Sequence, residues 1–353
     1  MLGCLALLAL SGCDSSTQVT ELSATQSSGT QEDGSAQKAS KAKDVKDENL
    51  VRTFDFKYAG TATELKAGQR VRIWIPQPSD SEHQTVEAQS TTYPSTVAKK
   101  ESNEDGRYGN QIHYFEATAD EDGKVAFEFN YRIKRHEATE YGAEEALSDE
   151  EIKNFTGANA MVPIDGKPIE LLDGKQLPTE MIQTGRALYD TVFEHMTYDK
   201  SKPGYGKGDS IWACDSRTGN CTDFHSLFIS LARSQKIPSR FEIGFPLPPV
   251  NKKKDNLSGK IGGYHCWAWF HAEGSGWVPV DISEADKHPE MKEFFFGHLT
   301  KDRVAFSSGR DIKLVPAADS EPLNYFVYPH IEVDGKKWPK DKIELDFSYS
   351  DPG

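Results

Sequence analysis

The chain has 353 residues, which is enough for two or three domains and a sizeable hydrophobic core. Its formal net charge is −14 and no stripe of lysine or arginine runs along it, so the phosphate backbone of a nucleic acid would repel it. The short basic runs at 252–254 and 336–337 are interpreted as solvated loops, and we expect no nucleic-acid partner.

The first residues combine a short apolar run with a cysteine. Residues 2–10 are too few to span a bilayer, but they have the length of the apolar region of a signal peptide. The run ends in LSGC at 10–13, which resembles the lipobox of bacterial lipoproteins, although no lysine or arginine precedes it. The resemblance implies cleavage before Cys13, lipidation of Cys13 and a location in the cell envelope facing the periplasm or exterior. Asp14 would favour the inner membrane.

A polar segment follows the cysteine. It is rich in Ser, Thr, Gln, Lys, Asp and Glu, has no aromatic residue, and cannot bury enough apolar surface to offset the entropy of ordering it. A flexible coil of ~35 residues spans roughly 30 Å. The sequence therefore predicts a signal peptide over residues 1–12 and a disordered tether over 13–49, which would hold a folded body off a membrane.

Residues 50–140 show a hydrophobic period of two, which is typical of strands with one buried face. The alternating residues fall in three runs: Phe54, Phe56 and Tyr58; Val71, Ile73 and Ile75; Val125, Phe127, Phe129, Tyr131 and Ile133. We predict an antiparallel β-sandwich-like domain here, with no visible catalytic cluster. An acidic connector follows over 141–178. Helical spacing over Met181–Met196 then opens a second domain, predicted over 179–350.

The stretch GNCTDFHSLFISLARSQKIPSR, residues 219–240, predicts a helix that begins at a cysteine. Apolar residues recur on one face at helical spacing: Phe224, Leu227, Phe228, Leu231 and Ala232. Asn220 and Asp223 fit a capping box, which places Cys221 at the first helical position. Unpaired amide groups and the helix dipole favour negative charge there, so Cys221 is a candidate thiolate nucleophile.

A thiolate nucleophile needs a base and a group that orients the base. GGYHCWAWFHA at 262–272 predicts a strand with His265 on one face and Cys266 on the other. WVPVDISEA at 277–285 predicts a second strand that ends at Asp281. A simple hairpin would leave Asp281 about three residues out of register with His265, and Pro279 indicates an edge strand or bulge that absorbs part of the offset.

The segments GNCTDFHSL, GYHCWAWF and GWVPVDISEA resemble the transglutaminase-like core of bacterial proteins, over residues 179–316. The resemblance implies an α+β fold in which the sandwich-like domain precedes a papain-like cysteine proteinase core. It also implies a catalytic triad of Cys221 as nucleophile, His265 as base and Asp281 as orienting acid. Donors to an oxyanion would be the backbone N–H of Cys221 and, as a second candidate, Trp212.

Each candidate residue also has a structural interpretation. Cys221 could be an inert buried thiol, His265 a core histidine among tryptophans, and Asp281 a helix cap. His225 lies one turn after Cys221 and is expected to make local hydrogen bonds. His271 lies near the turn and is expected to be structural.

Cys214 and Cys266 raise the question of oxidation, because thiols outside the cytoplasm can pair. A Cys214–Cys266 disulfide would leave Cys221 free, whereas a Cys214–Cys221 disulfide would block it, and the sequence leaves both open. We expect Cys221 to be reduced in the active protein. No CxxC pair completes a zinc site around His225, so we expect neither a metal nor another cofactor.

These inferences predict a membrane-tethered, transglutaminase-like thiol enzyme that acts on peptide or carboxamide bonds of a protein or peptide substrate. The acyl group on Cys221 would pass to water or to an amine, and hydrolysis is favoured. The alternatives are a catalytically silent module that binds a peptide or partner in the envelope, and a scaffold whose β-domain supplies the function. Arg303 and Arg310 could bind a substrate carboxylate, but pairing with Asp302 or Asp311 is favoured. The oligomeric state stays open.

Overall fold

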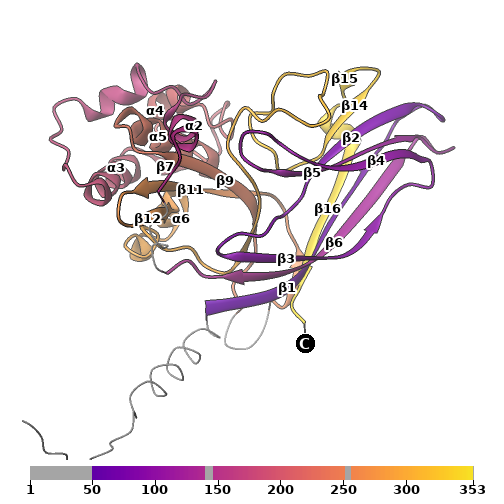
Figure 1. Cartoon of the computed structure of the whole chain (residues 1–353), viewed down its shortest axis with the longest axis horizontal. Coiled ribbons are helices and arrows are strands. Elements are labelled where there is room, and N and C mark those ends of the chain that lie inside the picture. Colours follow the sequence, from indigo (N-terminus) through magenta and orange to yellow (C-terminus); the bar gives the residue numbers. More distant parts are fainter. Residues whose placement is uncertain (1–49, 140–145, 251–255, 353) are drawn as a thin grey trace, which may run out of the picture. The chain divides into compact units, whose positions relative to one another are not determined.

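The computed structural model describes residues 50–139, 146–250 and 256–352, which belong to one compact unit, Lys46–Gly353. The predicted signal peptide, Cys13 and the predicted tether lie outside the described residues. None of the helices in the described ranges combines the length and the apolar character needed to cross a bilayer. Figure 1 shows two parts within this unit, a β-sandwich and a sheet covered by helices.

The sandwich consists of two antiparallel five-stranded sheets. The first sheet has the order β10-β16-β1-β6-β3, with β1 (Val51–Ala62), β3 (Gln84–Thr92), β6 (Val125–His136), β10 (Ser258–Lys260) and β16 (Ile343–Ser350). The second sheet has the order β15-β14-β2-β5-β4, with β2 (Arg70–Pro76), β4 (Val97–Glu104), β5 (Gln111–Thr118), β14 (His330–Val333) and β15 (Lys336–Lys337).

The predicted alternation of buried and less buried residues is confirmed in the strands of the sandwich. Every second residue of β1 is buried along the whole strand, so that Phe54 and Phe56 point inward. Phe115 on β5 meets Phe127 on β6 across the two sheets, with ring centroids 5.9 Å apart in an edge-on arrangement. Such a pair contributes about 0.5–1.5 kcal/mol beyond the burial of its area. Aromatic side chains therefore join the two sheets.

The last strands of the chain belong to the sheets of the sandwich, whereas the sequence analysis assigned residues 179–350 as a whole to the second domain. β16 pairs with β1 from Asp55 opposite Ser350 to Ala62 opposite Ile343, and β14 pairs with β2. Without β16, the hydrogen-bonding groups on one side of β1 would be unpaired. The chain thus leaves the sandwich after β6, builds the second part, and returns to complete both sheets.

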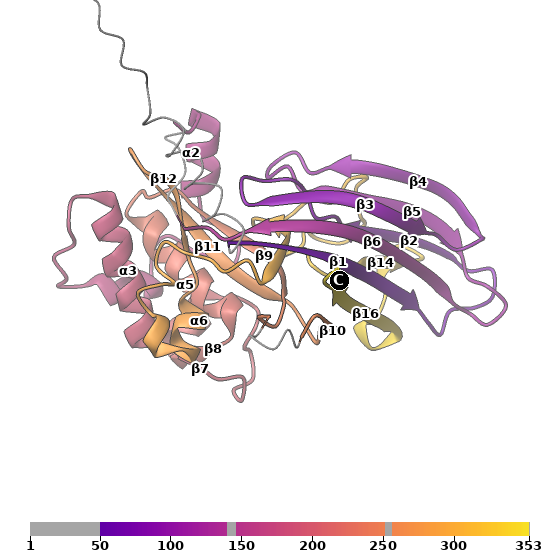
Figure 2. The same ribbon diagram turned by 90° about the horizontal axis from the view of Figure 1, so that it is seen from below.

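The second part is built on an antiparallel sheet of order β12-β11-β9-β13, with β9 (Ser239–Pro246), β11 (His265–Ala272), β12 (Gly276–Val280) and β13 (Arg303–Ser308). β12 is an edge strand, as Pro279 indicated. Figure 2 shows α3, α5 and α6 on one face of this sheet. The helices are α2 (Asp149–Thr156), α3 (Met181–His195), α4 (Ser210–Ser216), α5 (Cys221–Ser234), α6 (Ile282–Lys287) and the short 3₁₀ turns η2 (Lys167–Leu172), η3 (Pro289–Met291) and η4 (Lys340–Lys342). Two short parallel strands, β7 (Thr197–Tyr198) and β8 (Thr218–Gly219), precede α5.

The helix predicted over 181–196 is present as α3, and the helix predicted after Asn220 is present as α5. The prediction of a single buried stripe on α5 is wrong, because every residue from Cys221 to Arg233 is buried. The polar residues of its second face find partners in the interior. Arg233, for example, donates to the carbonyl oxygens of Ser239 and Gly157.

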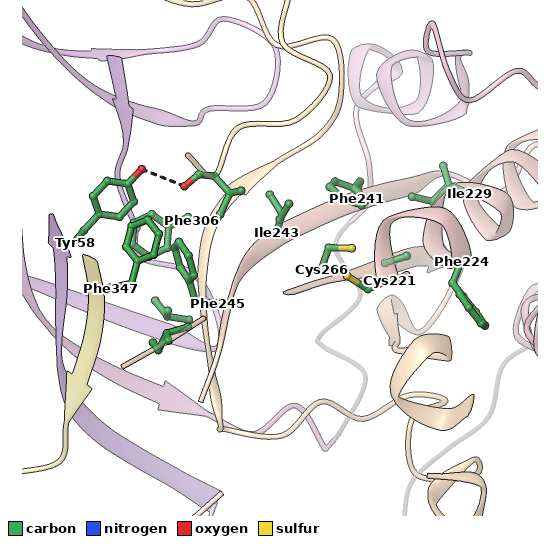
Figure 3. Packing of buried hydrophobic residues seen from close by; sticks show 14 of the residues in the cluster. Tyr58, Cys221, Phe224, Ile229, Phe241, Ile243, Phe245, Cys266, Phe306 and Phe347 are labelled. Atoms are coloured by element: carbon green, nitrogen blue, oxygen red, sulfur yellow. Dashed lines mark hydrogen bonds between the residues drawn. The ribbon is translucent and has the colours of Figure 1, made fainter. Parts of the chain in front are cut away.

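An aromatic cluster anchors the site-bearing sheet to the sandwich (Figure 3). Phe245 of β9 lies 4.5 Å from Phe347 of β16, and Phe306 of β13 lies 5.5 Å from Tyr58 of β1, measured between ring centroids. The hydroxyl of Tyr58 donates to the carbonyl of Val327 at 3.1 Å. β9 thus packs against the sandwich through Phe245 and pairs with β11, which carries His265.

Candidate active site

Cys221 is the first residue of α5, where the predicted capping box is present. The side chain of Asn220 accepts from the N–H of Thr222 at 2.9 Å, and the Asp223 carboxylate accepts from the N–H of Asn220 at 2.9 Å. A residue at this position has a backbone N–H without an acceptor inside the helix. Cys221 thus combines its sulfur with a free amide donor, at the positive end of the helix dipole.

Asp223 also holds the loop in front of the helix. Its carboxylate accepts from the N–H groups of Gly206 at 2.7 Å and Gly208 at 2.9 Å. Gly208 has φ +62°, and a Cβ there would lie 2.6 Å from the hydroxyl of Ser226. The loop can approach α5 so closely because glycine occupies this position.

The structure brings His265 and Asp281 to Cys221. His265 is the first residue of β11, and Asp281 directly follows β12 as the N-cap of α6. Since Ala268 opposes Val280, Asp281 lies across from Trp267, on the same face as His265. The Nε2 atom of His265 lies 2.8 Å from the Oδ2 atom of Asp281. The offset between the two residues in the register of β11 and β12 remains, and their side chains meet diagonally across the two strands.

Asp281 is fully buried but surrounded by donors. Besides His265, its carboxylate accepts from Nη1 of Arg303 at 2.9 Å, the hydroxyl of Ser283 at 3.2 Å and the N–H of Glu284 at 3.2 Å. Burial alone would raise the pKa of Asp281, but the charges of His265 and Arg303 hold that pKa well below its usual range. Asp281 is therefore ionised throughout the physiological range.

The charge on Asp281 extends to His265 and Cys221. Burial would lower the pKa of His265, but Asp281 and the hydrogen-bonded Cys221 raise it to about 9. Burial would raise the pKa of Cys221, but hydrogen bonds from Cys266 and His265 and the charge of His265 lower it well below its usual value. With Nε2 of His265 on Asp281, Nδ1 is the ring nitrogen left for Cys221. A thiolate–imidazolium pair results.

Cys266 is a second sulfur at the site, which the sequence assigned only to the opposite face of its strand. Figure 3 shows it beside Cys221, and the two side chains are hydrogen-bonded. Its sulfur also lies 3.8 Å from Oγ1 of Thr222 and 3.8 Å from Nδ1 of His225. Burial raises the pKa of Cys266, so it keeps its proton and donates to Cys221.

The three cysteines of the described ranges are free, so neither disulfide considered from the sequence is present there. Cys214 lies on α4, with its sulfur 3.7 Å from the carbonyl oxygen of Lys167. Its thiol lies against η2, whereas the sulfur of Cys266 lies against α5. The sulfur of Cys221 is not part of a disulfide, as a nucleophile requires.

His225 makes the expected local hydrogen bonds. Its Nε2 accepts from the N–H of Ile282 at 3.1 Å, and it donates to the carbonyl of Cys221 one turn earlier. Burial lowers the pKa of His225 to about 4, so the ring is neutral and links α5 to α6. His271 packs against Trp277 at the end of the β11–β12 hairpin, with ring centroids 5.4 Å apart.

Three other sequence-based assignments need correction. Arg303 pairs with Asp281 rather than Asp302, because β13 lies in the same sheet as β11 and β12. Arg310 does not pair with Asp311 but donates to Asn324, Ser226 and the carbonyl of Gly208. Trp212 lies on α4, beside Gly204, and is not among the residues that line the cavity at Cys221.

That cavity has a volume of about 690 Å³ and extends from Cys221 to the returning strands of the sandwich. Its aromatic lining comes from Tyr198, Tyr205, Tyr264, Tyr325, Tyr328 and Trp338. The hydroxyl of Tyr264 lies 3.0 Å from Nδ2 of Asn220 and 3.0 Å from Oγ1 of Thr222. The sequence analysis did not identify Tyr264, because its contacts depend on where α5 and β11 meet in the fold.

The segment that carries this site is similar to known proteins. Residues 170–282 match the transglutaminase-like superfamily, and the matched segment contains Cys221, His265 and Asp281. This segment is therefore similar to transglutaminase-like domains. An uncharacterized protein of Haemophilus influenzae is 26% identical over 306 residues, covering 75% of this chain and 81% of that protein.

The solved structures that match this chain include the following two. The crystal structure of a proposed cysteine protease from Cytophaga hutchinsonii matches with a TM-score of 0.51 and 14% identity, over 85% of this chain and 100% of that chain. The periplasmic domain of TgpA from Pseudomonas aeruginosa matches with a TM-score of 0.35 and 16% identity, over 69% of this chain and 90% of that one. The first match supports a shared fold over the part of the chain that it covers.

Proposed function

We propose that the chain is a thiol enzyme that acts on peptide or carboxamide bonds through an acyl-enzyme on Cys221. The observation that carries the proposal is the continuous contact from Cys221 through His265 to Asp281, with 2.8 Å between the last two. A nucleophile, a base and an orienting acid in this order are the requirements of acyl transfer by a thiol. The cavity gives a substrate access to the sulfur.

In the acylation step, the Cys221 thiolate attacks the carbonyl carbon and forms a C–S bond, while the π electrons move to the oxygen. The backbone N–H of Cys221 stabilises that oxyanion. The oxyanion then collapses, the C–N bond breaks, and the imidazolium of His265 gives its proton to the departing nitrogen. The products are a thioester on Cys221, a free amine and a neutral His265.

Tyr264 is a second donor to the oxyanion in this proposal. Its hydroxyl oxygen accepts from Nδ2 of Asn220 and, in one orientation, from the hydroxyl of Thr222. Both lone pairs are then occupied, and the phenolic proton goes to the hydroxyl of Tyr325, which also lines the cavity, or to an oxyanion that replaces this partner. Tyr264→Phe should therefore slow acylation without changing the pKa of Cys221, whereas an equal acylation rate in that variant excludes this role.

In the second step, neutral His265 takes a proton from water or an amine, which attacks the thioester and releases the thiolate. Water gives hydrolysis or deamidation, and an amine gives a cross-link. We propose hydrolysis as the main outcome. Incubating the protein with glutamine-containing peptides and a fluorescent primary amine separates them: shortened or deamidated peptides indicate hydrolysis, and incorporated label indicates transfer.

We also propose that a lipid on Cys13 holds the enzyme at the cell envelope, facing the periplasm or exterior. The LSGC segment after the apolar run supports this location. Metabolic labelling with a fatty acid should mark the wild type and not Cys13→Ser. Equal labelling of both would contradict the lipid anchor without affecting the proposed chemistry.

The direct test of the thiol chemistry is the alkylation of each cysteine by iodoacetamide as a function of pH, resolved by mass spectrometry. Cys221 should react well below pH 8 and lose this advantage in His265→Ala, because His265 stabilises the thiolate. Cys214 is the internal reference, since burial raises the pKa of its thiol. If Cys221 is inert at every pH in the folded protein, the domain is a binding module rather than an enzyme.

A further inference from the structure

The cavity beside Cys221 differs in charge from the rest of the chain. Its lining includes Lys200, Lys207, Lys337 and Lys340 but no Asp or Glu. The whole chain has the opposite balance, with Asp+Glu 55 against Lys+Arg 41. The lining therefore concentrates positive charge in a concave surface of an acidic protein, where low-dielectric walls focus the field.

None of these four lysines is in an ion pair with a carboxylate of the described residues, whereas other lysines are. Lys287 lies 2.6 Å from Glu284 and Lys292 lies 2.6 Å from Asp190. Burial and the neighbouring charge of Lys340 lower the pKa of Lys337, as expected where cations gather without an anion. Within the described ranges, no carboxylate pairs with this positive charge.

Two carboxylates close to these lysines have other hydrogen-bond donors. Asp223 is fully buried and accepts from the N–H groups of Gly206, Gly208 and Asn220. Glu332, which opposes Lys337 in the strand register, accepts from the N–H of Ser320 at 3.0 Å and lies 3.1 Å from Nε2 of His330. Neither carboxylate is among the residues that line the cavity.

Hydrogen bonds hold the backbone of the segments that carry Lys207 and Lys337. Lys207 lies between Gly206 and Gly208, which Asp223 holds, and its carbonyl oxygen accepts from Nδ2 of Asn324 at 2.7 Å. Lys337 lies on β15, which pairs with β14, so the basic run at 336–337 is a strand and not the loop expected from the sequence. Its position depends on the return of the chain to the sandwich. One wall of the cavity thus belongs to the loop in front of α5, and the other to strands more than 100 residues later in the sequence.

Aromatic and aliphatic side chains complete the lining. Tyr264 packs between Tyr325 and Tyr328, with centroid distances of 5.6 and 5.9 Å, and Ile331 and Leu345 lie on the sandwich side. A volume of about 690 Å³ is far more than one carboxylate needs and lies in the range of pockets that hold extended ligands. The ligand must combine planar or apolar surface with negative charge.

We propose that the cleft binds a peptide segment with carboxylate side chains next to the bond that Cys221 attacks. This inference rests on the proposed thiol chemistry and specifies its substrate class. Amide planes of the peptide pack on the tyrosines, and its carboxylates pair with Lys207, Lys337 and Lys340. A basic segment is repelled.

The test uses three chloroacetyl peptides of equal length on the full chain, with acidic, neutral or basic residues around the electrophile. Alkylation of Cys221 by the acidic peptide should be about tenfold faster than by the basic one at low salt, since several exposed pairs each contribute up to about 1 kcal/mol. The difference should collapse near ~1 M salt, where the Debye length is about 3 Å.

The variant Lys207→Gln/Lys337→Gln/Lys340→Gln should lose the acidic preference. Lys336→Gln is the matched control, because Lys336 neighbours Lys337 on β15 but does not line the cavity. Equal rates for the three peptides, or an acidic preference that survives in the triple variant, would overturn the inference. Iodoacetamide is run in parallel: if it shows no His265-dependent reactivity, the proposed chemistry fails, and if it does, only the substrate class is at stake.

Discussion

The sandwich and the transglutaminase-like domain fill their interiors in different ways. The sandwich core is aromatic and aliphatic, as the buried side chains of Phe54, Phe115 and Phe129 illustrate. The interior around α5 contains charged and polar groups that are almost completely buried: Asp223, His225, Arg233, Asp281 and Arg310. Apolar burial stabilises by area, whereas a buried polar group must find partners to offset the cost of leaving water. Burying polar groups costs free energy, but their hydrogen bonds fix the orientation of the side chains that form them.

Arg233 illustrates the second strategy. Its guanidinium donates to the carbonyl of Ser239, the carbonyl of Gly157 and the side chain of Asn159. These bonds tie the end of α5 to β9 and to the segment after α2. Because a helix is a rigid element, fixing its C-terminal end helps to hold Cys221 at its N-terminal end beside His265.

The largest expected effect is that of Asp281→Asn, which breaks the network at its centre. The change leaves Arg303 buried without its anion and should lower the free energy of unfolding by about 3–5 kcal/mol. It also removes the charge that raises the pKa of His265, so alkylation of Cys221 at pH 6 should fall about 10–100-fold. Urea unfolding and the iodoacetamide profile measure the two effects.

A double variant separates these effects. Asp281→Asn/Arg303→Met removes both buried charges and should recover much of the stability, but not the reactivity of Cys221. Recovery of both would mean that Asp281 acts only through the packing of the site, and would exclude its role as the orienting acid of His265.

The corresponding change in the sandwich is Phe129→Ala. Phe129 is fully buried and its ring lies 5.6 Å from Tyr93, so the cavity should cost about 3–5 kcal/mol. Because Phe129 lies in the apolar core, the pH dependence of Cys221 alkylation should be unchanged in the folded protein. A shift in the pH profile of Cys221 alkylation would contradict this expectation and show that packing in the sandwich core affects the active site.

The same contrast explains how much the sequence could predict. The strands of the sandwich follow from their period of two, and α5 with its cap follows from Asn220 and Asp223, because both patterns are local. The approach of Cys221, His265 and Asp281 was expected from the family resemblance, because the spacing alone left the register of the two strands open. The family resemblance supplied the roles that spacing could not.

The remainder depends on contacts between distant segments. The alternation in β16 indicates a strand, but nothing within it shows that its partner is β1. Arg303 belongs to no motif that the sequence shows. Its contact with Asp281 exists because β13 joins the same sheet. Local charge spacing favoured Asp302 as its partner, but Asp302 pairs with Arg52 instead. Cys266 became relevant only when β11 packed on α5.

The pH dependence of stability tests the charge pair itself. The raised pKa of His265, about 9 against an ordinary value of about 6.5, contributes stability that is fully present below about pH 6.5 and lost as the pH rises through about 9, at most about 3 kcal/mol. The lowered pKa of Cys221 acts in the opposite sense: its contribution is present above about pH 8.5 and lost on acidification.

Together the two contributions give a plateau between about pH 6.5 and 8.5, because the folded pair and the unfolded pair then bind the same number of protons. Cys221→Ser removes one side of the balance. Its free energy of unfolding should fall relative to the wild type as the pH rises from about 5 to 8.5. Parallel curves for the two proteins, from urea titrations at each pH, would argue against a thiolate in the folded state.

The smallest expected effect is that of Cys266→Ala, which removes one donor and keeps the rest of the network. A thiol is a weak donor, but its acceptor here carries a charge, so the loss corresponds to about 1 kcal/mol. The pKa of Cys221 should rise, and its alkylation at pH 6 should slow about threefold to fivefold, with His265 unaffected. Cys266→Ser restores a hydroxyl donor and should recover the rate. If alanine and serine behave alike, Cys266 only fills space beside Cys221, and the low pKa of Cys221 depends on His265 and the helix alone.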